Sequence, residues 1–228
     1  MKRYIAFAFI AIVAIVNPLV AQKSPDDEIK RIGEATMVLD EIMGASDKSV
    51  PRAIMEKAEG IAVFPSMLKG GLVVGASHGR GIISVRDKKN GGWSSPAFLT
   101  ITGGSFGAQI GAQAIDLVLV INGQRGLEQL VKNQFKIGAD ASVAAGPVGR
   151  DASASTDLQM RAQILSYSRS RGLFAGVTLN GSTIRQDRDA NERLYSVGYR
   201  TGQIVFDGMG GSPDSVKAWK DALTKYAK

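Results

Sequence analysis

The chain has 228 residues, no cysteine and a formal net charge of +7 from 28 basic and 21 acidic residues. Without cysteine it forms neither a disulfide nor a thiolate metal site, so a domain of this length depends on its apolar core for stability. The single histidine, His78, leaves little acid–base chemistry near neutral pH, and the positive charge favours anionic partners. The composition therefore favours binding or architecture over catalysis.

The first residues are typical of a secretory signal peptide. Lys2 and Arg3 precede an apolar run over residues 4–16, and a small residue follows at Ala21. The run is about 13 residues long, shorter than the roughly 18 to 20 that span a bilayer, so a retained membrane anchor is the weaker alternative. We predict a signal peptide over residues 1–21 and one domain over residues 22–228. No cysteine follows for lipid attachment, so we expect a periplasmic or secreted protein.

Two helices are predicted at the start of this domain. Ser24 and Pro25, followed by two aspartates, are typical of a helix start. Apolar positions then recur at three- and four-residue spacing as far as Gly44, which predicts one buried stripe. Its residues are Ile29, Ile32, Thr36, Leu39 and Met43. A second, shorter helix is predicted from Pro51 to Gly60.

Glycines divide short β-branched runs between residues 61 and 121, a pattern that predicts strands and turns. The predicted strands are residues 61–64, 72–76, 81–86, 97–102 and 116–121, the last apolar enough to be buried on both faces. The segment GASHGRG, from Gly75 to Gly81, is predicted to be a tight turn. A phosphate-binding loop is disfavoured there because the strand-like IISVR follows it, whereas such loops open a helix.

The second half mixes helices and strands. A helix is predicted after Asn122, which resembles an N-cap, and strands over residues 135–143 and 164–179, with a break at Arg171 and Gly172. Helices are predicted over residues 187–195 and from Ser212 onward. The last helix carries Val216, Trp219, Leu223 and Tyr226 on one face. The expected fold class is α+β: a twisted, largely antiparallel sheet with flanking helices, including N- and C-terminal helices.

Four motifs in this order resemble one known family. They are AVFPSMLKGGLVVGASHGRGIISVR (62–86), GGWSSPAFLTITGGSFGAQIGAQAIDLVLVI (91–121), GADASVAAGPVGR (138–150) and YSRSRGLFAGVTLNGSTI (167–184). The chain is similar over roughly Ile29 to Tyr199 to the SYLF family, also called the Ysc84 actin-binding domain. The resemblance implies a module that binds phospholipids or phosphoinositides. One departure is Asn180, where the family pattern leads us to expect an acidic residue.

Some eukaryotic members of the family also bind actin. Because we expect export, we do not carry that activity over, and we do not expect actin as a partner. Nucleic acid is not expected either, since the chain has no basic helix or aromatic stacking motif of a nucleic-acid module. We expect no metal and no cofactor, because His78 has no second histidine or cysteine to complete a ligand set.

Basic residues near the ends of the predicted strands are the candidate ligands for anionic headgroups, because arginine grips phosphate through two hydrogen bonds and lysine acts as a point charge. They are Lys69, Arg80, Arg86, Lys88, Lys89, Arg150, Arg169 and Arg171. The alternative is that these charges are scattered and serve solubility. Trp219 and Tyr226 are weaker candidates for membrane contact, since packing of the last helix on the domain's own sheet is favoured over insertion at a membrane surface.

These observations predict a non-enzymatic, exported protein that binds anionic phospholipid headgroups at a membrane surface. One alternative is a structural cell-envelope protein that docks a protein partner or self-associates through its glycine-rich sheet. Another is a hydrolase centred on His78, with Ser77, Ser84 or Ser105 as its nucleophile.

Overall fold

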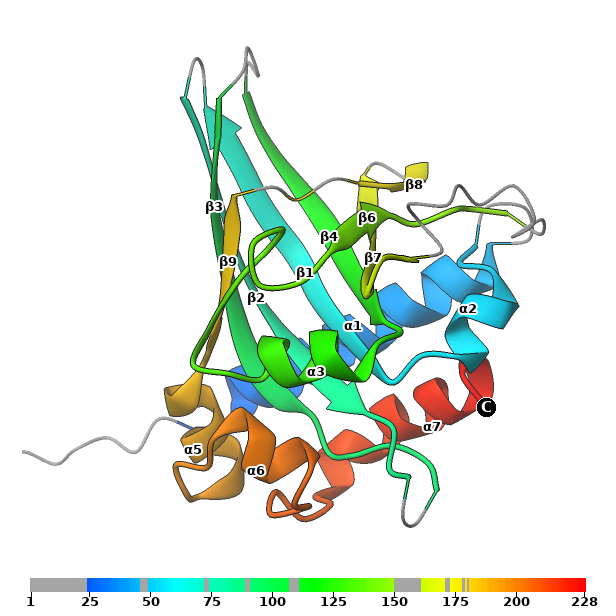
Figure 1. The fold of residues 1–228 in the computed structure, drawn as a ribbon. Helices are drawn as coiled ribbons and strands as arrows, with labels where there is room; N and C mark the ends of the chain where they lie inside the picture. Colours follow the sequence, from blue (N-terminus) through cyan, green and yellow to red (C-terminus); the bar gives the residue numbers. More distant parts are fainter. Residues whose placement is uncertain are drawn as a thin grey trace, which may run out of the picture.

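A curled sheet of nine strands forms the centre of the protein, in a computed structural model (Figure 1). The model describes residues 24–45, 49–71, 74–88, 91–106, 111–149, 161–170, 173–177, 179 and 181–228. The predicted signal peptide lies outside these residues. The strand order is β5-β9-β3-β2-β1-β4-β7-β6, with β8 also paired to β7. Among the strands of the described residues, β6 and β7 pair in parallel and the other pairs are antiparallel.

Four long strands occupy the middle of this order and five short strands its flanks. The long strands are β1 (Gly60–Gly71), β2 (Val74–Val85), β3 (Ala97–Phe106) and β4 (Gly111–Ile121). The short strands are β5 (Gln134–Lys136), β6 (Val143–Ala145), β7 (Ile164–Ser170), β8 (Leu173–Gly176) and β9 (Ser182–Gln186).

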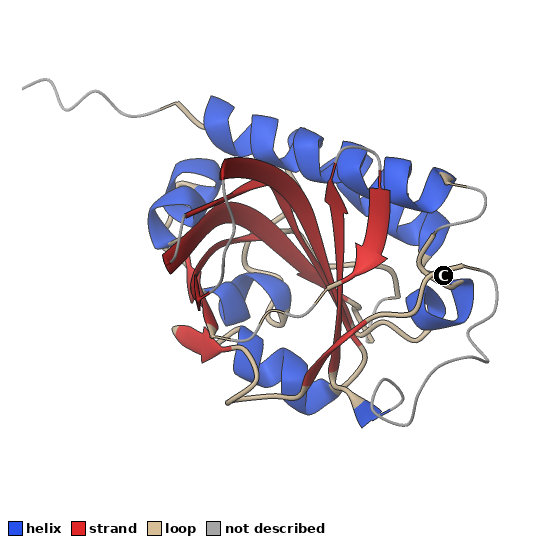
Figure 2. Ribbon diagram, turned by 90° about the horizontal axis from the view of Figure 1, so that it is seen from above, coloured by secondary structure: helices blue, strands red, loops and turns tan. Residues whose placement is uncertain are grey.

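Helices cover both faces of the sheet (Figure 2). They are α1 (Asp26–Gly44), α2 (Arg52–Glu56), α3 (Gln124–Leu130), α5 (Arg188–Tyr195), α6 (Thr201–Val205) and, after a 3-10 turn over Asp214–Val216, α7 (Lys217–Tyr226). The α+β prediction is confirmed, and so are the helices α1, α5 and α7. The short helix α6 was not predicted, and α2 ends at Glu56, so that Gly60 begins β1 instead of ending a helix.

The two faces of the sheet carry separate apolar cores. On the outer face, Val63, Ile82 and Phe98 pack under α1, α5 and α7. On the inner face, Phe64 and Leu99 pack with side chains of α3 and β5 within the curl. Residues 117–121 of β4 are fully buried and alternate between the two cores, as predicted for a strand covered on both faces.

The predicted turn at Gly75–Gly81 is wrong, because β2 runs through this segment and pairs with β1 on one side and β3 on the other. Gly81 instead allows close packing on the inner face. A Cβ there would lie 2.3 Å from the carbonyl oxygen of Val63 and 2.6 Å from Cδ1 of Phe64. The glycine is therefore needed for the approach of β1 to β2 and not for a chain reversal.

The close contact at Gly81 predicts a loss of stability on adding one methyl group. Gly81→Ala should lower the free energy of unfolding by about 1 to 3 kcal/mol, because backbone and ring would have to move. Gly33→Ala in α1 is the control: no atom lies within 4 Å of its new Cβ, so the better helix former should raise stability by about 0.5 to 1 kcal/mol. Urea denaturation of both variants measures this. An unchanged midpoint for Gly81→Ala would contradict the packing.

Candidate functional site

A row of polar side chains crosses four strands on the outer face, beyond the area that the helices cover. The register sets Arg80 of β2 opposite Thr100 of β3, Thr100 opposite Arg185 of β9, and Arg185 opposite Gln134 of β5. Directly opposed residues point to the same face of a sheet. The row is solvent-accessible along its length, since Arg80, Arg185 and Gln134 are exposed and Thr100 is half-buried.

A second row lies beside the first, because every second residue of a strand returns to the same face. Its residues are His78, Thr102, Thr183 and Lys136, opposed in that order. We call the eight residues of the two rows the outer polar face. It carries three permanent cations, three threonine hydroxyls, one amide and one imidazole, and no carboxylate.

The cations of this face have no acidic partner within the described part of the chain. No carboxylate among those residues lies within 4.0 Å of a side-chain nitrogen of Arg80, Arg185 or Lys136. Adjacent strands are about 4.8 Å apart, which places the Cα atoms of Arg80 and Arg185, two strands apart, about 10 Å from each other. Two unpaired guanidinium groups thus flank one threonine hydroxyl.

A hollow of about 560 Å³ adjoins the β2 side of this face, where α1 crosses the sheet. Arg80 and His78 line it together with Lys30, Asp27 and Glu34 of α1. The two carboxylates of α1 offset part of the basic charge at the hollow, whereas Arg185 on β9 and Lys136 on β5 lie farther along the outer polar face.

Three of the predicted basic residues instead serve the fold. The Arg86 guanidinium lies 4.9 Å from the ring centroid of Trp93 and donates to the carbonyl oxygens of Glu56 and Ala58. Lys88 pairs with Glu59 at 2.8 Å. Arg169 donates two hydrogen bonds to Oδ2 of Asp116, at 3.0 and 2.8 Å, and also pairs with Glu41.

Lys69 and Arg80 point to opposite faces of the sheet because of a bulge in β1. The pairing of β1 with both neighbours shifts by one residue between Phe64 and Met67. After the shift, Lys69 lies opposite Ser77, on the inner side, whereas Arg80 shares the outer side with His78. Ser66, inside the bulge, has a φ of 48°, and its N–H donates to Oδ1 of Asp116 at 2.9 Å.

The remaining predicted positions do not join the outer polar face. Trp219 is fully buried and donates from Nε1 to the hydroxyl of Ser84 at 2.8 Å. Tyr226 is half-buried and donates to Asp40 on α1 at 2.8 Å, so α7 packs on the protein itself. Lys89, Arg150, Arg171 and Asn180 lie outside the described residues.

His78 is not set beside either serine whose side chain the structure describes. His78 points to the outer face, whereas Ser77 points to the inner face. Ser84, on the outer face, is fully buried and bonded to Trp219. The side chain of Ser105 lies outside the described part of the structure.

Arg185 and Lys136 were missed in the sequence. The signal was present as alternation: Gln134 and Lys136 flank Phe135, which is fully buried, and Arg185 follows Ile184, also fully buried. Such alternation is typical of strands with one solvated face. The segments are only three and five residues long, and the pairing of β5 with β9 and of β9 with β3 could not be inferred from the sequence.

A buried ionic network fixes the helices next to this face. Glu28 of α1 is fully buried, and its Oε1 accepts hydrogen bonds from Nε and Nη2 of Arg193 on α5, at 3.0 and 2.7 Å. These bonds raise the pKa of Arg193. Arg31 donates to Asp187 at 3.0 Å, and Asp187 caps α5 by accepting from the N–H of Ala190. The network ties α1 to the end of β9, two residues after Arg185.

No helix within the described ranges is long and apolar enough to cross a bilayer. The same ranges contain no group of three histidine, aspartate or glutamate side chains arranged to hold a metal ion.

Comparison with known proteins identifies relatives of this chain. The Ysc84 family, described as "Las17-binding protein actin regulator", matches residues 102–226. SH3 domain-containing YSC84-like protein 1 of Rattus norvegicus is 36% identical over 161 residues, which are 70% of this chain and 47% of the relative. LAS seventeen-binding protein 3 of Saccharomyces cerevisiae (strain YJM789) is 31% identical over 208 residues, which are 90% of this chain and 44% of the relative. The chain spans about half the length of these curated relatives.

These relatives correct two predictions. They come from eukaryotes and are named for YSC84 and LAS seventeen, and the matching family is described as an actin regulator. The predicted periplasmic or secreted location is therefore wrong. The exclusion of actin is wrong for the same reason, because it depended only on the expected export.

The Glu28 network predicts a large effect on stability from one buried carboxylate. Glu28→Ala should lower the free energy of unfolding by about 3 to 5 kcal/mol, because Arg193 loses its carboxylate partner and the buried Arg31 keeps only Asp187 of its two. Glu34→Ala is the control: it breaks a surface pair with Lys30 at 3.8 Å and should cost less than about 1 kcal/mol. Thermal and urea unfolding measure both. Equal losses in the two variants would show that the buried network is not what holds α1 to α5.

Proposed function

The chain belongs to the Ysc84 (SYLF) family, and on that premise we propose that it is a non-enzymatic binding module whose outer polar face binds anionic phospholipid headgroups. The observation that carries the proposal is the row Arg80, Thr100, Arg185, in which two guanidinium groups without an acidic partner flank a hydroxyl. The composition of the chain and the description of its family as a regulator support binding over catalysis.

The chemistry of the row suits a phosphate. Each arginine offers a planar fork of N–H donors that can bind two phosphate oxygens, and threonine adds a neutral donor between them. Lys136 adds a point charge from the next row. Since none of the eight residues of this face is a carboxylate and none of its cations has an acidic partner in the described chain, a headgroup can reach these donors without first breaking an ion pair.

The contrast with Arg169 shows why this face is preferred over other basic positions. The Arg169 guanidinium is already paired with Asp116 and Glu41. A phosphate could bind this guanidinium only by displacing one of these two carboxylates. Arg80 and Arg185 require no such exchange. The proposal therefore keeps Arg80 from the predicted set and adds Arg185 and Lys136.

Co-sedimentation of the full chain with vesicles tests the proposal. Vesicles of phosphatidylcholine with phosphatidylserine, or with a phosphoinositide, should bind the protein, and vesicles of phosphatidylcholine alone should not. The double variant Arg80→Gln with Arg185→Gln should weaken binding about 30-fold at low salt, since each basic residue near an anionic bilayer contributes about 1 kcal/mol. Raising the salt should weaken binding of the unmodified chain.

The matched control removes the same charge elsewhere. Lys57→Gln with Lys228→Gln neutralises two exposed lysines near α2 and the C-terminus, away from β9 (Figure 1). This pair should reduce binding far less than the arginine pair. If both double variants lose binding equally, net charge alone attracts the protein and the outer polar face is not the site. If the unmodified chain binds none of the anionic vesicles, the proposal is refuted.

A second candidate function, binding to a protein of actin regulation, is favoured by the names of the relatives. One is called LAS seventeen-binding protein 3, and the family is described as an actin regulator. An acidic protein surface could bind the same cations, Arg80, Arg185 and Lys136, on the outer polar face.

Binding to purified yeast Las17 and to actin filaments, without lipid, tests this second candidate. Capture of either at physiological salt, weakened by Arg80→Gln with Arg185→Gln and retained with the two lysine substitutions, is the expected result if the outer polar face docks protein. If the unmodified chain captures neither, the second candidate fails while the lipid proposal stands on its own experiment.

A further inference from the structure

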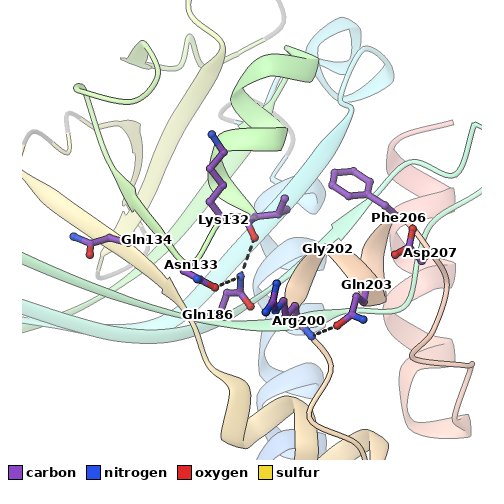
Figure 3. Close-up of a pocket in the computed structure, with 10 residues that line it drawn as sticks. Lys132, Asn133, Gln134, Gln186, Arg200, Gly202, Gln203, Phe206 and Asp207 are labelled. Carbon is purple, nitrogen blue, oxygen red and sulfur yellow. Dashed lines mark hydrogen bonds between the residues drawn. The ribbon is translucent and has the colours of Figure 1, made fainter.

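A cleft at the edge of the sheet takes no part in the function proposed above. It has a volume of about 650 Å³ and lies between the turn that joins α3 to β5 and the helix α6 (Figure 3). The residues that matter for its chemistry are Lys132, Asn133, Arg200, Gln203, Phe206 and Asp207. Gln134 lies at its border and also ends the first row of the outer polar face.

Gln186 holds the two walls of the cleft together. Its Nε2 donates to the carbonyl oxygen of Val131 at 3.0 Å and to Oδ1 of Asn133 at 3.2 Å (Figure 3). Its Oε1 accepts from the N–H of Thr201 at 3.1 Å. Val131 and Asn133 belong to the turn after α3, whereas Thr201 begins α6. The walls are therefore joined by side-chain hydrogen bonds that exist before any ligand enters.

The same network leaves amide donors available. Oδ1 of Asn133 accepts from Gln186 and also from Nη2 of Arg188 at 3.1 Å. Oε1 of Gln203 accepts from the backbone N–H of Arg200 at 2.9 Å. In each amide the oxygen thus accepts hydrogen bonds from the protein, while the NH₂ group, which can only donate, remains available. These two NH₂ groups therefore favour a ligand that accepts hydrogen bonds.

Two cations strengthen this preference. Nζ of Lys132 donates to Oε1 of Gln129 at 2.8 Å, which leaves two of its three N–H groups. Arg200 is exposed. Neither residue has a carboxylate within 4.0 Å among the residues that the structure describes. Asp207, beside Phe206, is the one carboxylate of the lining, so donors and positive charge predominate.

An apolar surface adjoins these donors. Phe206 is 41% exposed, which is high for a phenylalanine, and it lines the cleft next to Gly202. A Cβ at Gly202 would lie 3.8 Å from Cδ2 of the Phe206 ring, so the glycine leaves one side of the ring uncovered. A flat apolar group could pack there.

We propose that this cleft is a binding site for a small organic anion, a carboxylate or phosphate monoester that carries an aromatic or other apolar group. Lys132 and Arg200 hold the anionic group, with the amide NH₂ groups of Asn133 and Gln203 as further donors. Phe206 packs against the apolar part. The site is separate from the outer polar face, because none of its charged residues belongs to that face.

Titration of the full chain with four probes, followed by ligand-observed NMR and calorimetry, tests the site. Phenyl phosphate, benzoate or both should bind, and the stronger of the two identifies the anionic group. Benzyl alcohol, which has the ring without the charge, should not bind. Inorganic phosphate, which has the charge without the ring, should bind more weakly than phenyl phosphate.

Three variants assign the contacts. Arg200→Gln should weaken binding of the preferred probe about tenfold or more, as for the loss of a charge-assisted hydrogen bond. Phe206→Ala should weaken phenyl phosphate or benzoate about fivefold and leave inorganic phosphate unchanged. Arg185→Gln, on the outer polar face, is the control and should change neither. Unfolding midpoints check that each variant is folded.

Three results would overturn the inference. They are binding of neither phenyl phosphate nor benzoate, binding of benzyl alcohol as tight as that of the anions, and equal losses from Arg185→Gln and Arg200→Gln. Vesicle binding by the outer polar face is read out in a different assay and through different residues. Failure of one proposal is therefore distinguishable from failure of the other.

Discussion

The alternation of side chains along the paired strands is the constraint on which the rest of this structure depends. In β2, Ile82 and Arg80 point outward, whereas Gly81 and Gly79 point inward against Phe64 and Met67. The inward glycines let β1 and β2 approach closely, and the tight ladder then carries one register across β3, β9 and β5. The polar row on the surface therefore lies on the sheet face opposite this close packing, and the shared register aligns it across the four strands.

The helices decide which part of the outward face stays open. Their apolar sides cover Ile82 and Phe98, and the ionic network around Glu28 joins the first turn of α1 to α5 and to Asp187 after β9. Beyond that limit the same strands continue with Arg80, Thr100 and Arg185. The outer polar face therefore lies next to the buried ionic network of Glu28. In that network each arginine has a carboxylate partner, whereas Arg80 and Arg185 on the exposed face have none within the described residues.

Local patterns in the sequence were sufficient for the longer helices and the fold class, but not for the short helix α6 or the end of α2. The stripe through Ile32 and Leu39 is a short-range signal, and α1 formed as expected. The glycine-rich centre was misread at Gly75–Gly81, because a glycine that admits a neighbouring side chain looks, in sequence, the same as one that reverses the chain. The basic residues could not be sorted either: Arg169 and Arg80 look alike until Asp116, a partner 53 residues away, is placed beside the first.

The bulge in β1 decides which face a charged side chain takes through backbone register and not through residue type. Its one extra residue exchanges the two faces for everything that follows in the strand, so Lys69 points inward and Leu68 takes the place beside His78. Without the bulge, the same residues in strict alternation from Val63 would place Lys69 on the outer face and add a lysine to that surface. A change of backbone conformation at Phe64 to Met67 would thus alter the surface potential without replacing any charged residue.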